Sequence, residues 1–179
     1  MSIRRIAAIV TVLAALPLAG AFSAGGFSWG EQYLVPEHPE LANYDTQARF
    51  SAIYGYGVTG FGMRNGGFVL GVHSPDDPCG FEGGFIGAIS GQELRAGPFT
   101  FAVDLWTGIG GMHFAEGSQD GRFALFGQAD IEIAFRVFPG MRVAGYAGMQ
   151  GIADIVAWQP LAAAVYYTPV AGVRVAWGR

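Results

Sequence analysis

Residues 122–137 read RFALFGQADIEIAFRV, and this stretch decides the fold class because its two faces differ along its whole length. Every odd position is apolar, whereas five of the eight even positions are polar. The odd residues are Phe123, Leu125, Gly127, Ala129, Ile131, Ile133, Phe135 and Val137. Such period-2 alternation indicates a β-strand with one apolar face. The stretch exceeds the usual strand of about 5–6 residues. It suits a strand that crosses a bilayer at a tilt, which needs about 9–11 residues.

The composition favours a membrane barrel over a soluble protein. Hydrophobic residues make up 51% of the 179 residues and charged residues only 13%, about half the usual charged share. Beyond residue 21, no apolar run reaches the roughly 18 residues that indicate a transmembrane helix. The formal net charge of −4 and the lack of lysine argue against a nucleic-acid partner. Cys79 is the only cysteine, so no disulfide can form within the chain.

The N-terminal region predicts a signal peptide followed by an arm. Arg4 and Arg5 precede an apolar run, and Ala19-Gly20-Ala21 fits a cleavage site, so residues 1–21 are interpreted as a secretory signal. Residues 22–46 contain glycines, prolines and glutamates, and we expect a partly irregular N-terminal arm there. Residues 47–179 are interpreted as the β-barrel domain.

The first predicted hairpin turns at Asn65-Gly66-Gly67, a strong turn signal. Its apolar residues fall on even positions, which we therefore expect to face outward. These residues are Phe50, Ala52, Tyr54, Tyr56, Val58, Phe68, Leu70 and Val72.

Three further hairpins complete the predicted barrel. Their turns are expected at Ala96-Gly97-Pro98, Phe138-Pro139-Gly140 and Thr168-Pro169-Val170. A three-residue loop at Phe138–Gly140 would place Val137 opposite Met141 and Phe135 opposite Val143. Four hairpins make eight strands, so the predicted fold is an all-β, antiparallel, up-and-down transmembrane β-barrel. The interior of an eight-stranded barrel is just wide enough for side chains to fill.

At this point the chain resembles the small outer-membrane β-barrels of diderm bacteria, of the OmpA- and OmpX-like and opacity or surface-antigen type. The resemblance covers roughly residues 47–179 and rests on hairpins such as FRVFPGMRV at residues 135–143. The last strand also matches the family's C-terminal insertion signal at Gly172, Val175 and Trp177. The resemblance implies a place in the bacterial outer membrane, with membrane lipids and the barrel-insertion machinery as partners.

A set of charged residues is predicted to form a polar network in the lumen. Its members are Arg49, Asp104, Arg122, Asp130, Glu132, Arg136, Arg142, Asp154 and Arg174. One interpretation is a selective pore, and the other is a structural plug in which the buried charges pair with one another. Arg136 and Arg142 would face each other across the third turn and could bind an anion such as a lipid phosphate.

Other patterns support chemistry only weakly. His73, Asp76, Asp77 and Cys79 carry metal-ligand groups, but Asp-Asp-Pro is ordinary turn chemistry, so no metal or cofactor is predicted. His73 and Ser74 are adjacent and would point to opposite faces, and His113 has no obvious serine partner, so no catalytic residues are predicted. We expect a structural, surface or interaction role without catalysis. The alternatives are a narrow channel for small or apolar solutes, a lipid-modifying barrel enzyme, and a soluble periplasmic lipocalin-like or sandwich binder.

Overall fold

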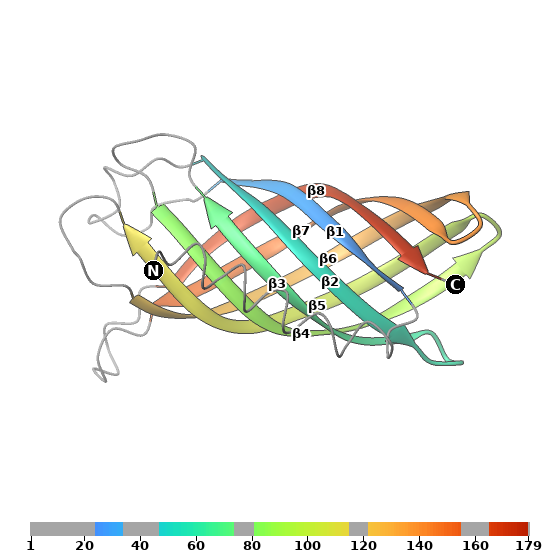
Figure 1. The fold of residues 1–179 in the computed structure, drawn as a ribbon, viewed down its shortest axis with the longest axis horizontal. Helices are drawn as coiled ribbons and strands as arrows, with labels where there is room; N and C mark the ends of the chain where they lie inside the picture. The colour runs from blue at the N-terminus through green and yellow to red at the C-terminus, as the bar shows by residue number, and fades with distance from the viewer. Residues whose placement is uncertain (1–23, 34–46, 74–80, 115–121, 155–164, 179) are drawn as a thin grey trace, which may run out of the picture.

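The computed structural model describes residues 24–33, 47–73, 81–114, 122–154 and 165–178. They form a closed barrel of eight strands in which every neighbouring pair is antiparallel (Figure 1). The strands are β1 (Ala24–Tyr33), β2 (Gln47–Val58), β3 (Met63–His73), β4 (Phe81–Ala96), β5 (Phe99–Phe114), β6 (Arg122–Phe138), β7 (Met141–Asp154) and β8 (Val165–Gly178). The predicted fold class is therefore confirmed. No helix among these residues is long and apolar enough to cross a membrane.

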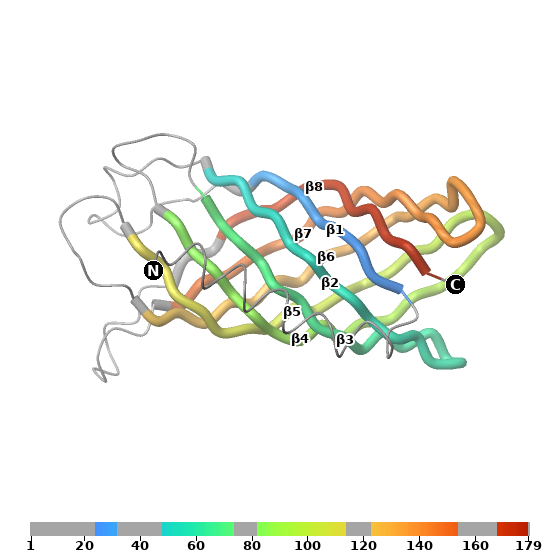
Figure 2. The backbone as a smooth tube through the Cα atoms, in the orientation of Figure 1, coloured from blue at the N-terminus to red at the C-terminus, as the bar shows by residue number. Residues whose placement is uncertain are grey.

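The two ends of the barrel differ in how the strands are joined. The short turns β2–β3, β4–β5 and β6–β7 all lie at one end, toward the right in Figures 1 and 2. The barrel closes between its first and last strands, with Ala24 opposite Gly178 at this same end. We call it the short-turn end. The opposite end, where the chain leaves and re-enters the sheet between the described ranges, is called the loop end.

The first strand corrects the domain boundaries expected from the sequence. Residues 24–33 were assigned to a partly irregular arm outside the barrel, yet they form β1 and pair with both β2 and β8. Three glycines obscured the strand pattern, and all three occupy crowded positions. A Cβ on Gly26 would lie 1.9 Å from the Val175 carbonyl oxygen, and one on Gly30 would lie 2.6 Å from the Phe50 ring. The predicted signal peptide, residues 1–21, lies outside the described residues.

The last predicted hairpin is wrong, because β8 is one continuous strand through Thr168-Pro169-Val170. Proline is tolerated in a sheet where no ladder hydrogen bond is required of it. Pro169 lies just before the β8–β1 ladder, whose pairing starts at Val170. The predicted number of eight strands is correct. The prediction counted two strands where β8 is one, and it left out β1.

The first turn is also displaced from its predicted position. The chain reverses at Thr59–Gly62, where the Gly62 amide donates to the Thr59 carbonyl at 2.9 Å. Gly62 has a φ of +79°, a conformation that favours glycine. The glycine-rich segment expected to turn lies within β3 instead. A Cβ on Gly66 would collide with the Gly55 carbonyl and with Tyr56, so this glycine supplies space within the sheet.

The β6–β7 hairpin matches the prediction except at its tip. Phe135 lies opposite Val143 as predicted, but Phe138, not Val137, lies opposite Met141, because the register shifts between Arg136 and Phe138. The turn is therefore the two-residue Pro139-Gly140 loop. A β-bulge supplies the extra residue that keeps the apolar faces of both strands on one side.

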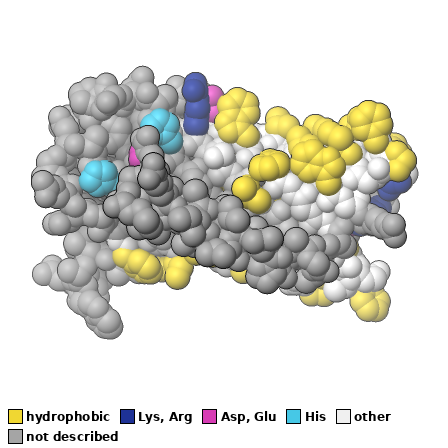
Figure 3. All heavy atoms as spheres, viewed as in Figure 1, with side chains coloured by type: hydrophobic (Ala, Val, Ile, Leu, Met, Phe, Trp, Pro, Cys, Tyr) yellow, Lys and Arg dark blue, Asp and Glu magenta, His cyan; other side chains and the backbone are white. Residues whose placement is uncertain are grey.

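The outer surface of the barrel carries a band of large apolar side chains. Figure 3 shows part of this band in yellow on the face that it presents. The exposed residues include Phe27, Trp29, Ile53, Ile86, Phe101, Val103, Leu105, Ile109, Leu125, Ile131, Ile133, Phe135, Val173 and Trp177. Soluble proteins rarely expose a contiguous apolar surface of this extent, whereas a lipid-facing barrel surface requires one.

The faces of β2 and β3 are the reverse of those expected. Phe50, Tyr54, Phe68 and Leu70 were predicted to face outward, yet each is buried in the lumen. The prediction assumed that apolar side chains face lipid, and this lumen is itself partly apolar. With the faces reversed, Arg49 lies on the outer surface, with its side chain 53% exposed and paired to Glu31 at 3.7 Å.

Candidate functional site

The lumen near the short-turn end contains a compact group of buried charges. We call it the charge layer, and it comprises Arg64, Glu93, Asp104, Asp130, Glu132 and Arg174. These side chains come from five strands, and each is buried. Because buried charges require partners, the contacts within this layer determine whether it can be stable.

Arg64 on β3 binds three carboxylates with its three guanidinium nitrogens. Its Nε donates to Glu93 Oε2 at 2.9 Å, its Nη1 to Asp104 Oδ2 at 2.7 Å, and its Nη2 to Glu132 Oε1 at 2.9 Å. The guanidinium also lies 4.6 Å from the centre of the Tyr56 ring, a cation–π contact. One cation from β3 therefore reaches β4, β5 and β6.

Arg174 on β8 forms the second hub of the charge layer. It binds Asp130 through two parallel hydrogen bonds of 2.8 and 2.7 Å, the bidentate geometry that arginine favours. Its Nη1 also donates to Glu132 at 3.0 Å. Glu132 accepts from both Arg64 and Arg174, so it links the two hubs.

Two further arginines neutralise the charge layer. Arg95 contacts Glu93 at 2.6 Å, and Arg142 lies 3.7 Å from the same carboxylate. Arg142 also donates to the Tyr56 hydroxyl at 3.0 Å. Among the described residues, the connected group then holds four guanidiniums and four carboxylates, so its formal charges balance.

The ion pairs cross the lumen and do not merely follow its wall. Arg174 on β8 reaches Asp130 and Glu132 on β6, which are not on a neighbouring strand. Asp104 and Asp130 face each other directly on β5 and β6, an arrangement that is destabilising unless cations lie between them. The two hub arginines supply those cations. The layer therefore acts as a cross-brace that fills the lumen.

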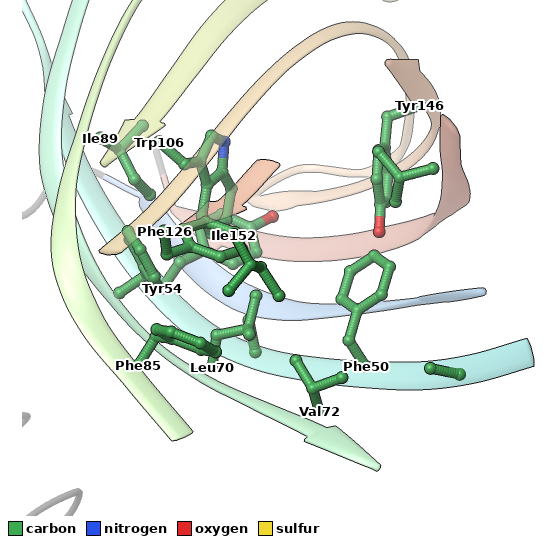
Figure 4. Close-up of a cluster of buried hydrophobic side chains, with 14 of the residues drawn as sticks. Phe50, Tyr54, Leu70, Val72, Phe85, Ile89, Trp106, Phe126, Tyr146 and Ile152 are labelled. Carbon is green, nitrogen blue, oxygen red and sulfur yellow. The ribbon is translucent and has the colours of Figure 1, made fainter. Parts of the chain in front are cut away.

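Aromatic side chains occupy the lumen on the loop-end side of the charge layer. We call them the aromatic layer, which comprises Tyr54, Phe68, Phe85, Trp106 and Phe126, all buried. Figure 4 shows much of this apolar cluster, with Tyr54, Phe85, Trp106 and Phe126 labelled. Phe68 lies 5.0 Å from Trp106 and 5.5 Å from Phe126, ring centre to ring centre. Arg174 packs 4.6 Å from the Trp106 ring, so the two layers are in contact.

The structure brings together only some of the predicted network. Asp104, Asp130, Glu132 and Arg174 lie in the charge layer, and Arg142 borders it with its side chain 12% exposed. Arg136 is exposed at the short-turn end. Arg49 is a correction, because it lies on the outer surface. The side chains of Arg122 and Asp154 fall outside what the structure describes.

Sequence reasoning missed Arg64 and Glu93. Arg64 was placed beside the wrong turn, and the strand that holds Glu93 has weak alternation because small residues lie on both faces. A usable signal existed for Arg64, which shares the even positions of Phe68, Leu70 and Val72. An arginine on a lipid-facing surface is costly, so its presence on this face indicates that the even positions face the lumen. Of the suggested metal ligands, residues 76–79 lie outside the described ranges. No cluster of metal-binding side chains occurs among the described residues.

The comparisons with known proteins place the fold but no function. No family model matches the chain, and no curated protein matches it. Among solved structures, the chain is similar to Ail, the attachment invasion locus protein of Yersinia pestis. The match has a TM-score of 0.50 and 13% sequence identity, and it covers 87% of this chain and 99% of Ail. The chain thus has the same fold as Ail, a closed eight-stranded antiparallel barrel.

Proposed function

We propose that the protein is an integral outer-membrane β-barrel with a closed lumen and a structural, surface or interaction role. The observation that carries the proposal is the pairing of an apolar outer band with a cross-braced lumen. The band supports insertion into lipid. The charge and aromatic layers support a plug over a pore, since interiors of this size are filled by side chains.

Insertion into the outer membrane is tested by gel mobility of that membrane fraction, with and without heating in detergent. We expect recovery in the outer-membrane fraction and a band that shifts on heating, because a folded barrel resists detergent until it is boiled. Recovery as a soluble periplasmic protein without a shift would overturn the proposal in favour of the lipocalin-like or sandwich binder.

The closed lumen is tested by conductance across planar bilayers containing the purified protein. We expect no discrete conductance steps, because ion pairs between β3, β8 and the facing strands cross the lumen. Reproducible steps that persist when the protein is diluted to single insertions would support the narrow-channel alternative. In that case the polar network would be a selectivity element and not a plug.

Export and assembly form part of the same proposal. Residues 1–21 would direct export, and Gly172, Val175 and Trp177 would be recognised by the barrel-insertion machinery. Trp177 is exposed on the outer surface and packs edge-on against Phe27, with ring centres 6.1 Å apart. Trp177→Ala should lower the yield of heat-shiftable protein in the outer membrane. Unchanged yield and unchanged assembly kinetics would remove Trp177 from the proposed signal.

The surface role is the least specific part of the proposal. The name of Ail refers to attachment and invasion, which is compatible with a role at the cell surface for a barrel of the same fold. The lumen charges engage one another and aromatic rings, which supports a structural role for them. The surface role is tested by measuring whether cells that express the protein bind to host or bacterial surfaces.

A further inference from the structure

A small cavity at the short-turn end is lined by three arginine residues. Its volume is about 230 Å³, and its walls include Arg95 from β4, Arg136 from β6 and Arg142 from β7. The turn residues Pro139 and Gly140 complete one side. Arg136 and Arg142 are directly opposed in the β6–β7 ladder, so three cations from three strands converge on one space.

The charges around this cavity do not balance. No carboxylate is among the described residues that line it. Two of its arginines, Arg95 and Arg142, contact Glu93, which also contacts Arg64. The charge layer with Arg95 and Arg142 is neutral as a group. Arg136 is therefore an extra cation, and its side chain makes no ion pair or hydrogen bond within the described part of the chain. The described residues that line the cavity therefore carry a net positive charge that an external anion can neutralise.

The cavity is also held in shape by the fold. The Tyr56 hydroxyl accepts from Arg142 at 3.0 Å, and Glu93 accepts from Arg95 at 2.7 Å. The backbone amide of Arg136 donates to the Pro98 carbonyl of the neighbouring turn at 2.9 Å. The β-bulge after Arg136 lies at the barrel rim, a place where bulges commonly redirect side chains.

We propose that this cavity binds a phosphate group. Guanidinium groups present planar, paired donors that match phosphate oxygens, and three arginines line this space. The group can belong to a phospholipid headgroup at the adjacent membrane surface or to a soluble phosphate ester. The inference goes beyond the proposed function and does not require the lumen to be closed.

The test uses the folded full-length barrel in octyl glucoside, a detergent without phosphate, with NMR of the arginine Nε–Hε groups as readout. Titration with inorganic phosphate should give saturable shifts. Arg136→Gln should weaken phosphate binding about tenfold, the loss of one charge-assisted contact. Arg136→Lys should recover part of it. Arg49→Gln, an arginine change on the outer surface near the loop end, should leave binding unchanged. A heat-shift gel on each sample shows that the barrel is folded.

Two bilayer arms separate the sources of the phosphate. In discs of an uncharged glycolipid, added inorganic phosphate should reproduce the detergent result. In discs containing phosphatidylglycerol, the same shifts without added phosphate indicate the lipid headgroup, and their appearance only on adding phosphate indicates a soluble ligand. The proposal is overturned if phosphate causes no saturable shift in any arm, if sodium acetate at equal ionic strength binds as well, or if Arg136→Gln binds like the wild type.

Discussion

The charge layer and the aromatic layer fill the same lumen by different chemistry. In the charge layer, two arginines hold four carboxylates by directional contacts of 2.7–3.0 Å. In the aromatic layer, rings lie 5.0–5.6 Å apart without such contacts. Removing one arginine from the charge layer deprives several buried carboxylates of a partner. Removing one ring from the aromatic layer leaves only a cavity. The two layers should therefore differ in how they respond to single substitutions.

Arg174→Leu should produce the largest loss of stability. The change leaves Asp130 without its bidentate partner and Glu132 with one cation instead of two. Removing one member of a buried ion pair costs about 3–5 kcal/mol. We expect the free energy of unfolding, measured by urea titration from lipid vesicles with tryptophan fluorescence, to fall by at least that amount.

A second substitution tests whether stranded charge causes this loss. Arg174→Leu combined with Asp130→Leu should be more stable than Arg174→Leu alone, because one stranded carboxylate is removed with its partner. If the double variant were as unstable as the sum of the single variants, the loss would reflect packing and not charge.

Phe68→Ala in the aromatic layer should rank second. It removes contacts with Trp106 and Phe126 and leaves a cavity, at a cost of about 3 kcal/mol. Phe101→Ala on the outer band is the matched control. This variant should lose less unfolding free energy, about 1.5–2 kcal/mol. Lipid chains fill the vacated space, so the only loss is the hydrophobic free energy of the removed ring. Equal losses in the same urea titration would show that Phe68 is not packed in the lumen.

The difference between the layers also explains what the sequence could predict. In β6 the lumen face is polar and the outer face apolar, so alternation alone assigned both faces correctly. In β2 and β3 the lumen face carries Phe50, Tyr54 and Phe68, and periodicity cannot distinguish an apolar lumen face from a lipid face. The same ambiguity sent Arg49 to the wrong side. Cross-lumen partners such as Arg64 and Glu132 depend on barrel closure, which no local pattern encodes.

Gly91→Ala should have the third-largest effect. Gly91 lies beside the charge layer, and a Cβ there would lie 2.2 Å from Asp104 Oδ1 and 2.5 Å from the Val103 carbonyl oxygen. Overpacking of this kind costs about 1–3 kcal/mol. Gly84→Ala on the same strand is the control, because its Cβ would meet nothing within 4 Å. Urea titration should separate the two variants, and a harmless Gly91→Ala would mean that the Asp104 position is looser than described.

Arg49→Gln should have the smallest effect of the four. Arg49 and Glu31 form an exposed pair at 3.7 Å, and such pairs contribute about 0–1 kcal/mol. The result also tests the assignment of faces in β2. If Arg49 pointed into the lumen, as alternation alone suggests, its removal would strand a buried carboxylate and match the loss from Arg174→Leu. If Arg49→Gln is nearly neutral and Arg174→Leu is strongly destabilising, the contribution of an arginine to the free energy of unfolding depends on the face of the barrel that it occupies.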